Sequence, residues 1–167
     1  ALLVTFNVLS LHAAPTKETL VVAVNQEPQD LAAQGCYKEV NAAGLRNVIE
    51  TLIALDPVSG EFRPVLATSW KRLDDRTIEF AIRQGVIFHD GSPMTAEAVA
   101  ASISYVWDPK NAFTIQEYGG SGTISAKAIN ANTVVVMSST ADPLLEFRTS
   151  LNGISSKKQL DENLASH

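Results

Sequence analysis

Residues 77–83 read Thr77-Ile78-Glu79-Phe80-Ala81-Ile82-Arg83, and this stretch decides the fold class. Its apolar side chains alternate with polar or small ones, which is the period of a half-buried β-strand. The preceding Asp74-Asp75-Arg76 is typical of a tight turn. We therefore expect a hairpin whose first strand holds Trp70 and Leu73.

A helix is predicted after the next turn, His89-Asp90-Gly91-Ser92-Pro93. Thr95 can cap its amino terminus, and Glu97 in the first turn favours the positive end of the helix dipole. Asp108-Pro109 ends it, because proline cannot continue a helix. The buried stripe of this helix is formed by Val99, Ile103 and Val106.

Further hairpins follow the Gly-rich link at 118–122. Two strands are expected, Ile124 to Ile129 and Thr133 to Met137, with Asn130-Ala131-Asn132 turning between them. A short amphipathic helix is expected from Pro143 to Thr149, and the final stretch is polar. The predicted class is α/β or α+β with antiparallel hairpins.

Upstream of the hairpin, the pattern is helical from Asn41 to Ile53 and ends at the turn Asp56-Pro57-Val58-Ser59-Gly60. Earlier still, residues 19–24 form a short β-rich apolar run that predicts a buried strand. A polar, Pro-containing loop at 25–30 follows this strand. The apolar positions of the predicted helix are Leu45, Val48, Ile49, Leu52 and Ile53.

The first residues are typical of a secretory leader. An apolar run at 1–9 is followed by the small residues near Ala13 and Ala14, which matches the core and cleavage end of a signal peptide. We expect residues 1–13 to be the remnant of this leader, with the mature chain starting at Ala14. The alternative is a buried strand or helix at the domain edge. The run is about half of the roughly 20 apolar residues that a membrane-spanning helix needs.

The composition excludes two classes of protein. The chain has 167 residues, 46% hydrophobic and 19% charged, with a net charge of −5. No basic stripe exists to neutralise phosphates, which argues against nucleic-acid binding. Cys36 is the single cysteine, so an intrachain disulfide cannot form.

Four sequence blocks, taken in order, resemble the family-5 extracellular solute-binding proteins, which include dipeptide-, oligopeptide- and nickel-binding members. They are residues 46–52 (RNVIETL), 64–70 (PVLATSW), 80–91 (FAIRQGVIFHDG) and 95–99 (TAEAV). Asp142-Pro143-Leu144-Leu145 continues the match. The resemblance implies the periplasmic-binding-protein type II fold, in which two lobes close over a solute in the cleft between them.

The same resemblance implies a division of this chain. Residues 14–40 would hold the first strand and cleft loop of lobe I, and residues 41–151 the subdomain appended to it. Residues 152–167 would start the return to lobe I. Because family members are around three times as long, we expect the chain to be an incomplete, amino-terminal part of the fold.

The cleft loop contains the candidate ligand-binding residues. By resemblance, Glu27, Pro28 and Gln29 would contact solute, with Asn25 and Gln26 beside them; the alternative is an ordinary solvated loop. The His89–Asp90 pair is interpreted as a turn whose aspartate bonds local backbone, and not as an acid–base pair or metal site. Trp70 and Trp107 are expected to pack in the core. We expect no catalytic residues, no metal site and no cofactor.

The sequence therefore predicts a periplasmic, secreted substrate-binding component of an ABC importer that is not an enzyme. Its expected partners are an oligopeptide or dipeptide solute and the membrane permease subunits. One alternative is a nickel- or metal-chelate-binding member of the same family. Another, of a different class, is a secreted structural or interaction domain without a ligand.

Overall fold

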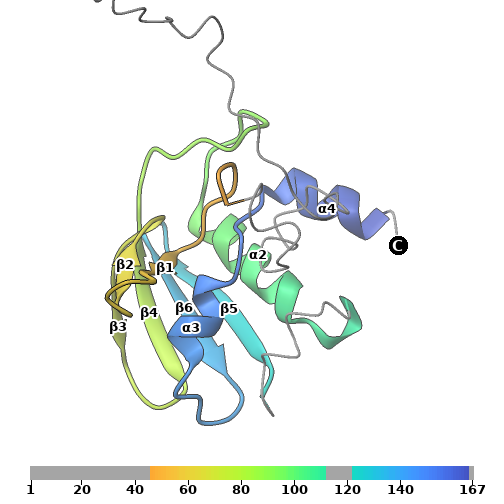
Figure 1. Ribbon diagram of the computed structural model, residues 1–167. Coiled ribbons are helices and arrows are strands. Elements are labelled where there is room, and N and C mark those ends of the chain that lie inside the picture. Colours follow the sequence, from red (N-terminus) through yellow and green to blue (C-terminus); the bar gives the residue numbers. More distant parts are fainter. Residues whose placement is uncertain (1–45, 112–121, 166–167) are drawn as a thin grey trace, which may run out of the picture.

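A four-stranded antiparallel sheet is the centre of the structure (Figure 1). The computed structural model describes residues 46–111 and 122–165. Both predicted hairpins are present, and the second strand of one pairs with the second strand of the other. In spatial order the strands are β3 (Ala67–Arg72), β4 (Thr77–Ile82), β6 (Thr133–Ser138) and β5 (Ile124–Asn130).

The pairing of β4 with β6 builds the apolar face of this sheet. Ile78 lies opposite Val136 and Phe80 lies opposite Val134, and all four side chains are fully buried. Directly opposed residues of an antiparallel pair share one face, so these four form the middle of the core. Alternation along β4 therefore gives the strand and its buried face, as predicted.

Helix α2 (Ala96–Trp107) packs against β5 and β6, and the short 3₁₀ turn η2 (Pro109–Asn111) follows it. The Thr95 side chain accepts a hydrogen bond from the Ala98 amide at 3.2 Å, which confirms the predicted cap. The predicted stripe is buried as well. Asp108 is the carboxyl-terminal cap, so the helix ends where Asp108-Pro109 indicates.

Two serines fasten α2 to neighbouring backbone. The Ser104 hydroxyl lies 3.2 Å from the Ala126 carbonyl oxygen and accepts from the Ala126 amide at 3.0 Å, on edge strand β5. The Ser102 hydroxyl, fully buried, donates to the Gly153 carbonyl at 3.3 Å and accepts from the Ser155 amide at 2.9 Å. The helix thereby joins the sheet edge to the last part of the described chain.

A second, small hairpin replaces part of the predicted helix at 41–53. Arg46 to Val48 form a turn, and β1 (Ile53–Leu55) pairs with β2 (Phe62–Pro64). The helix prediction is wrong for the described residues because their carbonyl groups bond other segments. The Leu52 carbonyl accepts from the amides of Val65 and Ala67, and the Glu50 carbonyl accepts from the Ile154 amide. Helical spacing here reflects two buried side chains next to each other, Leu52 and Ile53.

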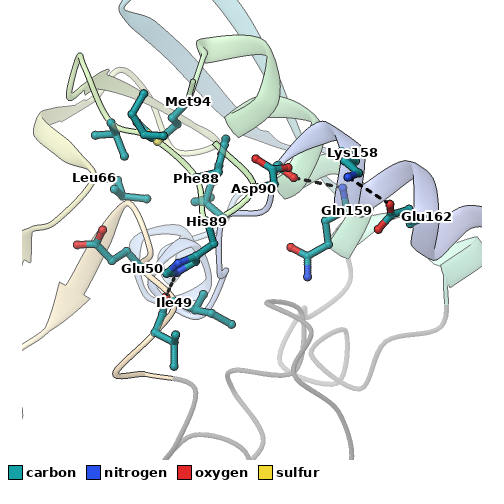
Figure 2. A pocket seen from close by; sticks show the side chains of 15 residues that line it. Ile49, Glu50, Leu66, Phe88, His89, Asp90, Met94, Lys158, Gln159 and Glu162 are labelled. Atoms are coloured by element: carbon teal, nitrogen blue, oxygen red, sulfur yellow. Dashed lines mark hydrogen bonds and ion pairs between the residues drawn. The ribbon is translucent and has the colours of Figure 1, made fainter. Parts of the chain in front are cut away.

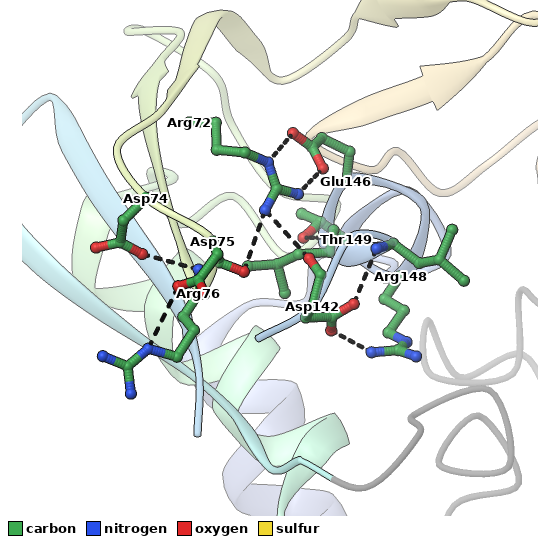
Figure 3. A network of polar contacts seen from close by, with 10 residues as sticks. Arg72, Asp74, Asp75, Arg76, Asp142, Glu146, Arg148 and Thr149 are labelled. Atoms are coloured by element: carbon green, nitrogen blue, oxygen red, sulfur yellow. Dashed lines mark hydrogen bonds and ion pairs between the residues drawn. The ribbon is translucent and has the colours of Figure 1, made fainter. Parts of the chain in front are cut away.

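Helix α3 (Leu145–Ser150), one residue shorter than predicted, lies against β1 and carries a network of ion pairs (Figure 3). Arg72 on β3 forms a two-point ion pair with Glu146, with its Nε donating at 3.0 Å, and also donates to the Asp142 carbonyl at 3.1 Å. The hydrogen bonds from Arg72 to Glu146 raise the arginine's pKa above its usual value. Arg148 pairs with the carboxylate of Asp142, which is only 2% exposed.

The end of the described chain is more ordered than its polar composition indicates. Residues 152–156 are all buried, and α4 (Lys157–Ala165) follows. Ile154 and Leu160 belong to the same hydrophobic cluster as the sheet and α2. Polar residues are buried here because backbone partners exist, as Ser102 shows.

The predicted leader at 1–13 and the predicted strand and loop at 14–40 lie outside the described residues. Within the described ranges, no helix combines the length and apolar character needed to cross a membrane.

Candidate functional site

The loop between β4 and α2 has a fixed shape. The Phe88 amide donates to the Ser92 carbonyl at 2.8 Å, and the Met94 amide donates to the Val86 carbonyl at 2.9 Å. Gly91 has φ +82°, a conformation that a side chain would strain, and its amide bonds the Phe88 carbonyl at 2.9 Å. His89 and Asp90 stand at the tip of this loop.

Asp90 stabilises the loop and also contacts α4. Its Oδ1 accepts from the Ser92 amide at 2.9 Å and from the Ser92 hydroxyl at 2.5 Å, which confirms that the aspartate bonds local backbone. A further hydrogen bond, from the Ser156 side chain, is the largest cause that lowers the pKa of Asp90 to about 2. Ser156 accepts from the Gln159 amide at 3.2 Å, so Asp90 is bonded to the first turn of α4.

His89 makes the opposite contact, with the beginning of the described chain. Its Nε2 lies 3.0 Å from the carbonyl oxygen of Val48. Because a carbonyl oxygen only accepts hydrogen bonds, Nε2 carries the hydrogen in this contact. The two residues of the loop tip therefore bind different segments, one entering the module at 46–50 and one at its end.

A pocket of about 400 Å³ lies between these three segments (Figure 2). Its interior is apolar, whereas its rim carries the loop tip and α4. The Lys158 ammonium and Glu162 carboxylate pair across one turn of that helix at 4.0 Å. The apolar lining residues are Val48, Ile49, Leu66, Val86, Ile87, Phe88, Met94 and Ile154. The polar lining residues are Glu50, His89, Asp90, Ser156, Lys158, Gln159 and Glu162.

The chemistry of this pocket is that of contact and not of bond cleavage. His89 and Asp90 bond separate partners, so they do not form an acid–base pair. Among the residues at 46–111 and 122–165, no three His, Cys, Asp or Glu side chains are grouped to hold a metal ion. What the pocket offers is apolar surface with a polar rim, which suits binding of a peptide segment or small molecule.

The residues predicted to contact solute are not part of this pocket as described. Asn25, Gln26, Glu27, Pro28 and Gln29 lie outside the described residues, so their role stays a prediction.

Both tryptophans pack as expected. Trp107 is 3% exposed and belongs to the core, and Trp70 is half-buried against it.

The sequence analysis missed the contribution of α4 to the pocket. A signal was present in Ser156, because a serine before a lysine- and glutamate-rich stretch is typical of a helix start. The contact between Ser156 and Asp90 joins residues 66 positions apart, and no local pattern predicts it.

Comparison with known families identifies the module that carries this pocket. Residues 61–164 match the family described as "Bacterial extracellular solute-binding proteins, family 5 Middle". The matched region is more than half of the chain. The chain belongs to this family. Its fold is accordingly that of periplasmic binding proteins, and the family is one of binding proteins and not of enzymes.

One curated relative of this family-5 chain is the periplasmic murein peptide-binding protein MppA of Escherichia coli (strain K12). The two are 28% identical over 148 residues, which are 89% of this chain and 26% of MppA. The chain thus spans about a quarter of the length of that relative.

Solved structures give the same placement. The chain is similar to NikZ from Campylobacter jejuni, solved in complex with Ni(L-His), with a TM-score of 0.71 and 27% identity over 87% of this chain and 28% of that one. It also shares the fold of a dipeptide binding protein from Pseudoalteromonas sp. SM9913, solved with Met-Leu. There the TM-score is 0.70, with 21% identity over 84% of this chain and 32% of that one.

Proposed function

We propose that this family-5 chain is part of the substrate-binding component of an ABC importer that carries oligopeptides or dipeptides. The observation that carries the proposal is the similarity to MppA, whose printed name specifies a murein peptide. That similarity spans 148 residues of this chain, whereas Arg46 to His167 comprises only 122. At least 26 residues before Arg46 therefore belong to the aligned region.

The proposal places the protein in the periplasm and gives it two partners, a peptide solute and the membrane permease subunits. The leader-like residues 1–13 support export. Solute would be held between two lobes, with the loop of Glu27, Pro28 and Gln29 lining the cleft and the module of residues 41–151 appended to the first lobe. In such a clamp, binding depends on burial and hydrogen bonds from both sides.

A second candidate is a nickel or metal chelate. Its support is the similarity to NikZ at 27% identity, which is comparable to the similarity to MppA. The two candidates differ in the ligand that the same cleft would accept, and one experiment separates them.

The experiment is calorimetry on the protein encoded by the complete reading frame that contains this chain. It is titrated with mixed di- to pentapeptides and, separately, with the nickel complex of L-histidine. Saturable peptide binding is the expected result, and Gln29→Ala should weaken it by about tenfold, the loss of roughly one hydrogen bond to the solute. Glu61→Gln, an exposed change in the described module, should leave affinity unchanged.

Saturation by the nickel complex and not by peptides would replace the first candidate with the second. Saturation by neither ligand would leave the secreted structural or interaction domain as the function. With the 167-residue chain alone, we expect no saturable peptide binding, because both sides of a clamp are needed to bury a solute. Micromolar binding by that chain would contradict the two-lobe proposal.

A further inference from the structure

The pocket between the loop tip and α4 leaves more apolar surface exposed than a finished surface does. Val48 is 53% exposed and Ile87 is 61% exposed, and both line this pocket of about 400 Å³. An isolated exposed apolar residue, such as Val58 in the turn after β1, is ordinary on a protein surface. Two of them beside buried apolar neighbours in one concave site mark a surface that another segment covers.

The path of the chain indicates which segment that is. Val48 and Ile49 line the pocket, and Arg46 is only two residues before Val48. The preceding part of the chain, 45 residues long, must therefore leave from the pocket wall. His89 holds this wall in place through the Val48 carbonyl, so the exit point is fixed relative to the loop tip.

The composition of the preceding stretch fits an apolar pocket. Residues 31–45 read LAAQGCYKEVNAAGL, with Lys38 and Glu39 as their only charged side chains, which cancel. Leucine, alanine, valine and tyrosine dominate, so the stretch can bury apolar surface without burying an unpaired charge. The MppA alignment must include at least 26 residues before Arg46, which places this stretch within the shared fold.

We propose that the pocket is the docking surface for residues 31–45 of the same chain. Docked there, the stretch covers Val48 and Ile87 and contacts the polar rim formed by α4 and the loop tip. The pocket is then an internal joint of the protein and is not its solute site. The proposal does not depend on which solute the protein carries.

The first test uses charge as a probe of burial in the 167-residue chain. If residues 31–45 cover Val48, then Val48→Lys forces an ammonium group against apolar surface and lowers the melting temperature by at least about 5 °C. Val58→Lys is the matched control, because Val58 is 95% exposed and should shift the melting temperature by no more than about 1 °C. Equal, small shifts for both variants would overturn the proposal, since Val48 would then face water.

The second test identifies the occupant through Cys36, the single cysteine of the chain. Gln159→Cys adds a second thiol on the pocket rim, and Asn130→Cys adds one in a different hollow, between β5 and the loop before α2. A short bismaleimide should join Cys36 to the new thiol within one molecule for the Gln159 variant, and not for the Asn130 variant.

The products are separated by denaturing electrophoresis and the linked peptides are mapped by mass spectrometry. Crosslinks only between molecules would assign the pocket to a second copy of the chain and would overturn the proposal. Absence of a crosslink in the Gln159 variant, or equal linkage in both variants, would overturn it as well.

Discussion

At the α3 corner, Arg72, Asp142 and Arg148 bond charged or backbone groups of the same module, whereas at the α4 end the pocket leaves Val48 and Ile87 more than half exposed. The corner joins β3 to α3 and involves no residue outside 72–149. The α4 end joins the two segments through which the chain enters and leaves the module.

This difference indicates which side of the module faces the rest of the protein. Buried charges that are paired and hydrogen-bonded need no further partner, and they are costly to expose or to leave alone. Apolar surface at a pocket, in contrast, gains free energy whenever another segment covers it. The α3 corner is therefore closed, and the α4 end is open to a neighbour.

Removing the Asp142 carboxylate should have the largest effect on the closed corner. Asp142→Ala leaves Arg148, whose side chain is 11% exposed, without its carboxylate, and frees the Leu144 amide that bonds Oδ1 at 2.9 Å. Loss of one partner of a buried pair costs about 3–5 kcal/mol, which urea unfolding would measure. As a control, Asp161→Ala removes an exposed partner of Lys157 and should cost about 0.5 kcal/mol or less. Similar costs for the two variants would remove the contrast between corner and surface.

The two serines of α2 test how the open end is supported. Ser102→Ala leaves the buried Ser155 amide without its acceptor, beside the pocket residues Ile154 and Ser156, and should cost about 1–3 kcal/mol. Ser104→Ala, two residues along, should cost about 1 kcal/mol or less, because Ser104 is half-buried and water can replace its hydroxyl at Ala126. A larger cost for the second variant would show that the sheet edge, and not the chain end, depends on α2.

The smallest effect is expected at the loop tip, and it should depend on pH. The pKa of Asp90 in the folded chain is about 2, below its ordinary value of 3.8, so folding favours the ionised form. The stabilisation is fully present above about pH 4 and is lost as the pH falls toward 2. The Asp90–Ser156 coupling in a double-mutant cycle of Asp90→Asn and Ser156→Ala should therefore vanish near pH 2. A coupling that is the same at pH 7 and pH 2 would contradict this assignment.

Local patterns in the sequence predicted the elements that repeat a period over six or more residues. The alternation around Phe80 gave β4, and the spacing of Val99, Ile103 and Val106 gave α2 together with its cap at Thr95. These elements were accessible because one buried face imposes its period on the chain. The turns at both hairpins were equally clear from Asp and Asn residues.

The remaining features depend on contacts between distant segments. Strands β1 and β2 have three residues each, too few to show a period, so Leu52 and Ile53 mimicked a helix. The burial of residues 152–156 follows from the Ser102 hydroxyl, which no local pattern announces. The pocket required the meeting of 46–50, 86–94 and α4, and it was not predictable from any one of them.

Ser104 also has a consequence for the solubility of the protein. Strand β5 is an edge of the sheet, and an edge strand with free amide and carbonyl groups can pair with the same strand of another molecule. By bonding both the amide and the carbonyl of Ala126, the Ser104 hydroxyl occupies the outward-facing position in the middle of that edge. A single serine on a helix thus blocks intermolecular sheet growth at the centre of this edge.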